Sequence, residues 1–266
     1  PTNLSSFDEH LRRVNTSLGA LDCAPLGIDE LIGARLYTGA LYVKYNAVLR
    51  AAADPNNQFN VRRCHSLCRG NKYVTTIHVI SSAIIKLGKI MPAERVYRGV
   101  SESCIPRGFW QPDEFKIRGG IELGFMSATL DPEIAYGYAA ARGKGMMVFE
   151  THMGMVDRGA DLSWLSQFPL ERETTFPPLT GLEVRAMRVH DAILVVEVRL
   201  DINLGATIEQ VIAKMQSSHL QLLDIMREDL FFAGVPRTGL APLVALRRKQ
   251  AARGGAWFNS IDNYKQ

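Results

Sequence analysis

The chain has 266 residues, of which 47% are hydrophobic and 22% are charged, and its formal net charge is +4. That length and apolar content suffice for one substantial core with a smaller lobe. The mild charge gives no indication of a nucleic-acid or membrane partner, because no basic run is longer than Arg247-Arg248-Lys249. No apolar stretch reaches the roughly 18 residues of a membrane span. The chain begins at Pro1 without a signal-peptide pattern, which leaves open whether a targeting segment precedes it.

The four cysteines, Cys23, Cys64, Cys68 and Cys104, do not have the spacing of a disulfide framework. Cys64, His65 and Cys68 raise the question of a zinc site, but the chain supplies no second ligand pair for it. We therefore expect reduced thiols in a cytosolic environment and no bound metal.

The first third of the chain is expected to be helical. One helix is predicted from Asp29 to Arg50, where apolar residues recur at helical spacing and the polar stretch ADPNNQ follows. A second helix is predicted from about Tyr73 to Ile90, with Pro92 stopping it. Residues 1–92 accordingly form an expected helical lobe.

The middle of the chain is rich in strand patterns. Short β-type runs are RVYRGV at 95–100, IELGFMSATL at 121–130, MMVFETHM at 146–153 and AILVVEVRL at 192–200. After the second run, Asp131 and Pro132 provide a cap and a first turn for a helix. A last helix is expected from about Thr207 to Leu230. A helical lobe, a strand-rich core at 93–204 and a helical element at 205–266 favour an α+β fold.

The stretch VYRG places Arg98 and Gly99 next to each other on a predicted strand. A guanidinium group keeps its charge and offers a planar set of donors that suits phosphate oxygens. A glycine allows a ligand to approach the backbone closely. Taken alone, such a pair is more often a salt bridge at a strand edge.

The stretch GFMSATLDPEIA places Ser127 and Thr129 at the end of a predicted strand. Residues two apart on a strand share a face, so the two hydroxyls are available to orient a nearby carboxylate. The alternative is that both hydroxyls bind backbone groups at the junction of strand and helix.

The stretch ERETTFPP, residues 171–178, sets Glu171 and Glu173 on either side of an arginine. On a strand the two carboxylates would share a face, and their repulsion would raise one pKa. The loop before them carries Trp164 and Phe168. Aromatic side chains on such a loop suit recognition of a partner, and the alternative is ordinary packing onto the core.

In this order, the three motifs resemble those of the Arg-Ser-Glu class of ADP-ribosyltransferases. The middle motif of that class is usually Ser-Thr-Ser, and Ser127-Ala128-Thr129 keeps its first position and departs at the other two. The segment YTGALYVKYNAVLR, residues 37–50, resembles the helix before the core in arginine-directed members. The resemblance extends from about Leu31 to Leu200.

The resemblance implies an α+β fold with two facing β-sheets, NAD as co-substrate and no metal. Glu173 would stabilise the positive charge that develops on the ribose as nicotinamide leaves. Ser127 would orient that carboxylate with support from Thr129. Arg98 would bind the NAD phosphates, and backbone groups of Gly99 would bind the nicotinamide amide.

The resemblance also implies an acceptor side. Glu171 would position or activate the acceptor side chain, while Trp164 and Phe168 would contact nicotinamide and the protein target. Residues 157–184 resemble bacterial effectors of the CteC type, which implies a threonine of ubiquitin as acceptor and a secreted protein acting in a host cytosol. We expect a monomer with a protein substrate, and neither nucleic acid nor a membrane span.

Three alternatives remain open at this point. The protein is an arginine-specific transferase, an NAD glycohydrolase with water as acceptor, or a module that binds NAD or protein without catalysis. Replacing each glutamate in turn separates these alternatives, because they assign different work to Glu171 and Glu173.

Overall fold

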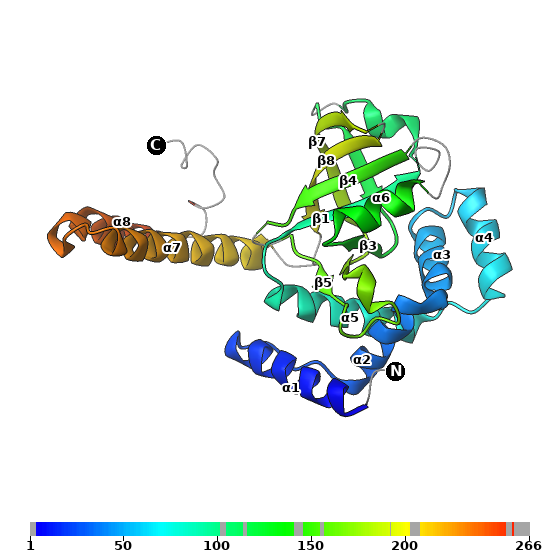
Figure 1. The fold of residues 1–266 in the computed structure, drawn as a ribbon, viewed down its shortest axis with the longest axis horizontal. Coiled ribbons are helices and arrows are strands. Elements are labelled where there is room, and N and C mark those ends of the chain that lie inside the picture. Colours follow the sequence, from blue (N-terminus) through cyan, green and yellow to red (C-terminus); the bar gives the residue numbers. More distant parts are fainter. Residues whose placement is uncertain are drawn as a thin grey trace. The chain divides into compact units, whose positions relative to one another are not determined.

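The computed structural model describes residues 4–101, 105–113, 116–140, 146–154, 157–191, 193–202, 208–253 and 257. The chain divides into two compact units, Pro1–Asn203 and Leu204–Gln266. The first unit combines helices with a mixed sheet and contains all three motifs, whereas the second is helical (Figure 1). The α+β fold expected from the sequence is confirmed.

Helices form the first part of the larger unit. In chain order they are α1 (Leu4–Ala20), α2 (Ile28–Leu36), the π-helical turn η1 (Tyr37–Leu41), α3 (Tyr42–Ala53), α4 (Gln58–Cys68) and α5 (Val74–Ile90). The prediction of one continuous helix over Asp29–Arg50 is wrong, because the backbone of Gly39 is not helical, with φ −100° and ψ −170°. The second predicted helix is confirmed as α5. The sequence did not predict α1 and α4.

Strands and short helices form the rest of that unit. The strands are β1 (Arg95–Ser101), β2 (Gly119–Glu122), β3 (Met126–Thr129), β4 (Met146–His152), β5 (Ala160–Asp161), β6 (Glu173–Phe176), β7 (Thr180–His190) and β8 (Ile193–Ile202). The helical elements between them are η3 (Arg107–Trp110), α6 (Pro132–Ala140) and η4 (Pro169–Glu171). The strands are ordered β2-β7-β8-β4-β1-β3-β6-β5, and β4 runs parallel to β8 while the other neighbours are antiparallel.

The run predicted as one strand at 121–130 is two strands, β2 and β3. Local side-chain bonds replace sheet pairing between them. The Glu122 carboxylate accepts a hydrogen bond from the Gly124 N–H at 3.0 Å, and Asn46 of α3 binds the backbone of Phe125. Backbone groups bound in this way do not extend a ladder. As a result β3 is a separate strand, and it pairs with β1.

The junction of β1 and β3 divides the sheet. Within the described residues a single Cα pair, Tyr97↔Thr129, joins these strands, whereas β1 pairs with β4 along its whole length. On one side of the junction lies a five-stranded part, β2-β7-β8-β4-β1, and on the other a three-stranded part, β3-β6-β5. The core expected from the resemblance is therefore present as two parts of one mixed sheet.

Apolar clusters cover both faces of the sheet. The larger one gathers alternate residues of β1, β4 and β8, among them Val96, Phe149 and Val196. Since successive residues of a strand point to opposite faces, Val148 lies on the other side. There it packs with Ala135 and Ala139 of α6. Small side chains let α6 lie close to β1 and β4.

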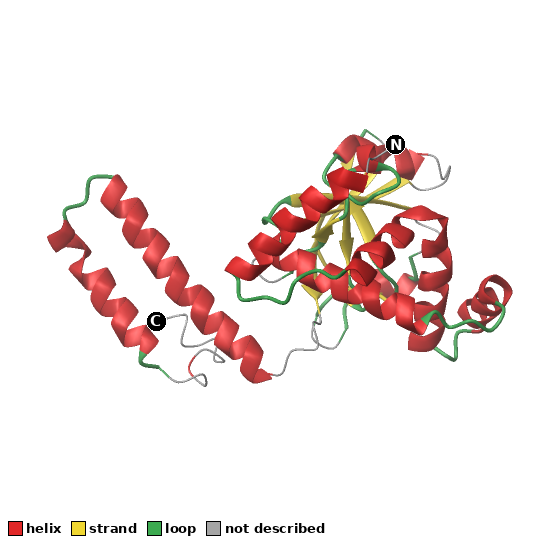
Figure 2. Ribbon diagram, turned by 90° about the horizontal axis from the view of Figure 1, so that it is seen from below, coloured by secondary structure: helices red, strands yellow, loops and turns green. Residues whose placement is uncertain are grey.

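The second unit is a pair of helices. α7 (Ile208–Phe232) and α8 (Ala241–Ala251) lie side by side and are joined through η5 (Arg237–Leu240) (Figure 2). The Asp224 carboxylate accepts both hydrogen bonds from Nε of Arg247 at 2.8 and 2.9 Å. The last predicted helix is confirmed as α7, whereas α8 was not predicted. No helix among the described residues has the length and apolarity of a membrane span.

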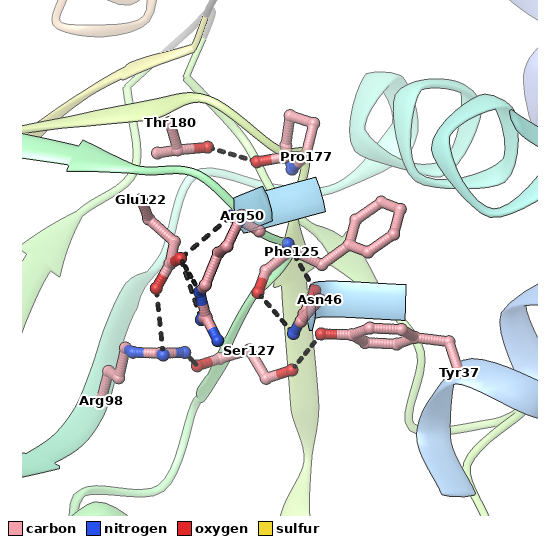
Figure 3. A network of polar contacts seen from close by, with 10 residues as sticks. Tyr37, Asn46, Arg50, Arg98, Glu122, Phe125, Ser127, Pro177 and Thr180 are labelled. Atoms are coloured by element: carbon pink, nitrogen blue, oxygen red, sulfur yellow. Dashed lines mark hydrogen bonds and ion pairs between the residues drawn. The ribbon is translucent and has the colours of Figure 1, made fainter. Parts of the chain in front are cut away.

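Asn46 connects the helical lobe to the sheet. Its buried side chain accepts a hydrogen bond from the Phe125 N–H at 2.9 Å and donates one to the Phe125 carbonyl at 3.3 Å (Figure 3). The Phe125 ring is itself buried in the helical cluster with Tyr37. Backbone groups buried without partners are unfavourable, so this one amide side chain fixes where β3 begins.

We expect Asn46→Ala to destabilise the fold, because it removes the partner of both Phe125 backbone groups. Each buried group left without a partner costs about 1–3 kcal/mol. The Tm measured by circular dichroism should therefore fall by several degrees relative to the wild type. Asn56→Ala, at an exposed position after α3, is the matched control and should leave the Tm in place. Equal Tm values for the two variants would contradict this role of Asn46.

Candidate functional site

Four polar residues of two adjacent strands share one face of the sheet. In the antiparallel pair of β3 and β6, Thr129 lies opposite Glu173 and Ser127 lies opposite Thr175. Directly opposed residues point to the same side, so Ser127 and Thr175 present their hydroxyls to the Glu173 carboxylate. Glu173 and Thr175 are buried, at 9% and 0% exposed. Burying a carboxylate in such a place is unfavourable in free energy unless the carboxylate has a functional role or is bound by hydrogen-bond or charge partners.

Burial raises the pKa of Glu173 above its ordinary value. Hydrogen bonds from the hydroxyls of Ser127 and Thr175 oppose the rise, and the Thr175 Oγ1 lies 3.2 Å from Oε1 of the carboxylate. The negative charge of Glu171 adds to the rise. The expected pKa increase is therefore present in the pair, but burial contributes more to it than the second glutamate does.

Tyr37 holds the other side of Ser127. The two hydroxyl oxygens are 3.0 Å apart, and the Tyr37 ring packs edge-on against Phe125 with centroids 5.1 Å apart (Figure 3). Burial raises the pKa of Tyr37, so its hydroxyl keeps its proton at neutral pH. None of the three sequence motifs includes Tyr37. The feature of the sequence that could have pointed to Tyr37 is its hydroxyl-bearing side chain just before Gly39, the residue at which the predicted helix breaks.

Arg98 starts on the opposite face from Glu173. Tyr97 pairs with Thr129, so alternation along β1 places Arg98 on the side of the larger apolar cluster. Its guanidinium group nevertheless turns to the junction of β1 and β3, where Nη1 donates to the Ser127 carbonyl at 2.6 Å (Figure 3). Arg98 and Glu173 therefore meet at one residue: Arg98 binds the main chain of Ser127 and Glu173 its side chain.

Glu122 links Arg98 to a second arginine. Its Oε2 lies 3.5 Å from Nη2 of Arg98, and its Oε1 accepts hydrogen bonds from Nε and Nη2 of Arg50 at 3.1 and 3.0 Å (Figure 3). Two guanidinium groups thus face one carboxylate. The cluster has a surplus of positive charge, which suits an anion such as a phosphate. No motif in the sequence indicates that Arg50 and Glu122, which are 72 residues apart, belong to the site.

Gly99 is required by the packing of α6. A Cβ atom there would lie 2.3 Å from the Ala135 carbonyl oxygen and 2.9 Å from the Ala139 nitrogen. No larger residue fits without moving the helix. The backbone groups of Gly99 point to the same edge as those of Tyr97, which is the β3 side. Their contact with nicotinamide stays a prediction.

Glu171 is not on a strand, so the prediction that it shares a strand face with Glu173 is wrong. It ends η4, and Arg172 follows in the left-handed region with φ 47°. That turn reorients the chain before β6 begins. The Glu171 carboxylate accepts a hydrogen bond from the Tyr138 hydroxyl at 2.7 Å, and its carbonyl accepts one from Thr129 Oγ1 at 2.6 Å. Thr129 therefore contacts the backbone of Glu171.

The two loop aromatics have different surroundings. Trp164 is half-buried, packs against the helical cluster and stacks on His10 with ring centroids 5.7 Å apart. Phe168 is 55% exposed, and its carbonyl accepts a hydrogen bond from the Glu171 N–H at 3.0 Å. Phe168 thus lies at the surface next to the turn that carries Glu171, whereas Trp164 packs the loop against the helical cluster. Recognition of a target by either residue stays a prediction.

The helical lobe holds the loop that carries these aromatics. The Arg35 guanidinium group donates to the carbonyls of Leu165 and Ser166, and the Gln167 N–H donates to Thr38 Oγ1 at 3.1 Å. The sequence does not predict these roles of Arg35 and Thr38, because nothing in a helical segment indicates which distant loop it will bind. These bonds keep the start of the loop in place ahead of η4.

The three cysteines that the structure describes form no assembled site. Cys23, Cys64 and Cys68 are free thiols, and Cys104 lies outside the described residues. Across the part of the chain that the structure describes, no three His, Cys, Asp or Glu side chains are grouped so as to bind a metal ion.

Solved structures share this fold. The chain is similar to the ADP-ribosyltransferase HopU1 of Pseudomonas syringae pv. Tomato DC3000, with a TM-score of 0.51 and 21% identity, over 73% of this chain and 85% of that chain. This is the fold of an ADP-ribosyltransferase. Vis toxin, an ADP-ribosyltransferase from Vibrio splendidus, is similar at a TM-score of 0.48 and 16% identity, over 79% of this chain and 90% of that one.

Exoenzyme S from Pseudomonas aeruginosa, in a form bound to carba-NAD, is similar at a TM-score of 0.43 and 19% identity, over 64% of this chain and 72% of that one. No protein-family model and no curated protein matches the chain. At 21% identity, the similarity to HopU1 shows the ADP-ribosyltransferase fold.

The raised pKa of Glu173 predicts a stability that depends on pH. From the ordinary pKa of 4.5 up to the raised pKa, the folded state binds more protons at Glu173 than the unfolded state does. Stability is therefore lost as pH rises through that window. Glu173→Gln removes the ionisation, so its Tm should exceed that of the wild type at pH 7. The difference should disappear as pH falls below 4.

Glu9→Gln, at an exposed position of α1, serves as the control for that measurement. Its Tm should follow that of the wild type across the same pH range. A Glu173→Gln variant that is no more stable than the wild type at pH 7 would show that the site compensates fully for burial of the carboxylate.

Proposed function

We propose that the protein is a mono-ADP-ribosyltransferase, which moves ADP-ribose from NAD to a side chain of a protein target and releases nicotinamide. One observation carries the proposal: Glu173 is buried beside the Ser127 hydroxyl on adjacent strands of an ADP-ribosyltransferase fold. A buried carboxylate that accepts hydrogen bonds from the Ser127 and Thr175 hydroxyls is suited to act on a cation.

In this proposal Glu173 acts on the ribose. The bond between ribose C1′ and the nicotinamide nitrogen breaks, and its electron pair leaves with nicotinamide. Positive charge then develops on the ribose, next to the Glu173 carboxylate. The attraction is stronger in the transition state than in the ground state, so it lowers the barrier. Ser127 keeps the carboxylate oriented, and Tyr37 keeps Ser127 in place.

Arg98 and Gly99 bind NAD in this proposal. The positive surplus of Arg50 and Arg98 over Glu122 supports binding of the phosphates. The backbone groups of Gly99 lie at the edge of β1 that faces β3, where pairing stops after Tyr97 among the described residues. Open backbone donors and acceptors at that point suit the nicotinamide amide.

Glu171 acts on the acceptor in this proposal. It lies close enough to Glu173 for their charges to interact, and the exposed Phe168 is next to it. The sequence resemblance supports a threonine of ubiquitin as the acceptor and a secreted bacterial effector as the protein, with an arginine side chain as the alternative. A threonine hydroxyl is a weak nucleophile and gains most from a nearby base.

Replacing Glu173 tests the function directly. Glu173→Ala should lower the release of nicotinamide from NAD by roughly 100-fold or more, because the charge on the ribose loses its stabilisation. Nicotinamide is measured by chromatography, and circular dichroism shows that the fold survives. Nicotinamide release at the wild-type rate from a folded Glu173→Ala variant would rule out the proposed role of this carboxylate.

Replacing Glu171 separates a transferase from a glycohydrolase. Glu171→Gln should lower the labelling of protein in a cell lysate by biotinylated NAD roughly 100-fold, to a level that is still measurable, while nicotinamide release continues. Mass spectrometry of the main labelled band identifies the acceptor, and a labelled threonine of ubiquitin or a labelled arginine decides between those two. No nicotinamide release and no labelled protein with the wild type would instead favour a binding module without catalysis.

Arg98→Lys tests the phosphate contact. A lysine retains the charge but loses the planar pair of donors, so the KM for NAD should rise about tenfold with a smaller effect on kcat. Arg95→Lys is the matched control, since Arg95 lies on the same strand and pairs with Glu150 at 2.9 Å. A similar KM for the two variants would contradict the assignment of Arg98.

A further inference from the structure

A tyrosine of α6 holds the carboxylate of Glu171. The Tyr138 hydroxyl donates a hydrogen bond to Oε1 of Glu171 at 2.7 Å, across 33 residues of sequence. Tyr138 also interacts electrostatically with Tyr42 and Glu173. The residue is 47% exposed. The hydroxyl is thus at the site, while part of Tyr138 remains accessible to solvent.

The helix that carries Tyr138 is firmly placed. Its first turn is capped by the Asp131 carboxylate, which accepts a hydrogen bond from the Glu133 N–H at 3.0 Å. Its inner face rests on β1 at Gly99, where a Cβ atom would come within 3.0 Å of the Tyr138 Cβ. Since the support is rigid, the position of the Tyr138 hydroxyl is fixed to within the freedom of one side chain.

The same junction of strand and helix holds the main chain of Glu171. Thr129 Oγ1 donates to the Glu171 carbonyl at 2.6 Å and accepts a hydrogen bond from the Asp131 N–H at 3.0 Å. One hydroxyl therefore ties the start of α6 to the turn at Glu171. With Tyr138 on the carboxylate, Glu171 is held at both its backbone and its side chain.

We propose that Tyr138 is a positioning residue for the transfer step, which orients the Glu171 carboxylate toward the acceptor. This inference rests on the proposed function. Tyr138 occupies Oε1, which leaves Oε2 for the acceptor. In the transfer step the acceptor lone pair forms the bond to ribose C1′, and its proton passes to Glu171. Tyr138 keeps its own proton.

The electrostatics agree with that assignment. The hydrogen bond to Glu171 is the main cause that raises the pKa of Tyr138 to about 12, with burial contributing next. The hydroxyl therefore remains a donor throughout the neutral range. A hydrogen bond to a charged group is among the stronger ones in proteins, and even a half-exposed one restricts the rotation of the carboxylate.

The test compares two activities of one variant. Tyr138→Phe removes the hydroxyl and keeps the ring. Nicotinamide release is measured without lysate, and protein labelling is measured with biotinylated NAD and a cell lysate. The ratio of labelling to release should fall about tenfold, since the acceptor step depends on Glu171 and the cleavage step on Glu173. Tyr136→Phe, on the same helix but stacked on His190, should leave the ratio unchanged.

A double variant shows whether Tyr138 acts through Glu171. In the Glu171→Gln background, Tyr138→Phe should cause no further fall in the ratio, because its partner carboxylate is already absent. An additional fall, or an unchanged ratio for Tyr138→Phe in the wild-type background, would overturn the inference.

Failure of this inference is distinct from failure of the proposed function. If the wild type releases no nicotinamide, the proposed function itself is wrong, and the inference falls with it. If the wild type releases nicotinamide but labels neither lysate protein nor itself, NAD cleavage stands and the positioning role is overturned, because there is no acceptor step for Tyr138 to support.

Discussion

Ser127 is the residue at which the separate parts of the site meet. Its carbonyl accepts a hydrogen bond from Arg98, and its hydroxyl contacts both Tyr37 and Glu173. The helical lobe, the first strand and the strand with the buried carboxylate thus converge on one small side chain and its peptide group. A larger residue would separate them, and one without a hydroxyl would leave two partners unsatisfied. The geometry of the site depends on β3 starting at the right place, which Asn46 ensures.

The sequence predicted the parts of the site that lie on strands. Ser127 and Thr129 were placed correctly on one face, because alternation along a strand is a property of the backbone itself. That Glu173 points to the same side depends on the pairing of β3 with β6, which alternation within one strand does not predict. The same rule failed for Glu171, because Arg172 adopts the left-handed conformation and so breaks the alternation. Nothing in the sequence Glu171-Arg172-Glu173 predicts that turn. Alternation along a strand predicts the face of a side chain only as far as the residue at which a turn begins.

Contacts between elements that are distant along the chain could not be predicted from the sequence. Four residues contact the three motifs directly or through one another, yet in the sequence each resembles an ordinary member of its own helix or strand. They are Tyr37, Arg50, Glu122 and Tyr138. Their roles arise when helices pack on the sheet, which single-sequence patterns do not describe. The same holds for the helix predicted across residues 29–50. Its apolar spacing continues through Gly39, while the backbone there turns to bring Tyr37 and Thr38 to different neighbours.

The single backbone pair between β1 and β3 has a thermodynamic consequence. Cooperative unfolding depends on connections between the parts of a domain, and here the ladder contributes one pair between the two parts of the described sheet. Side chains such as Arg98 supply the remaining connections across that line. A molecule bound across the junction would add contacts that the backbone omits. The free energy of unfolding would then rise with the concentration of that molecule, so the protein's resistance to proteolysis would depend on the supply of that molecule.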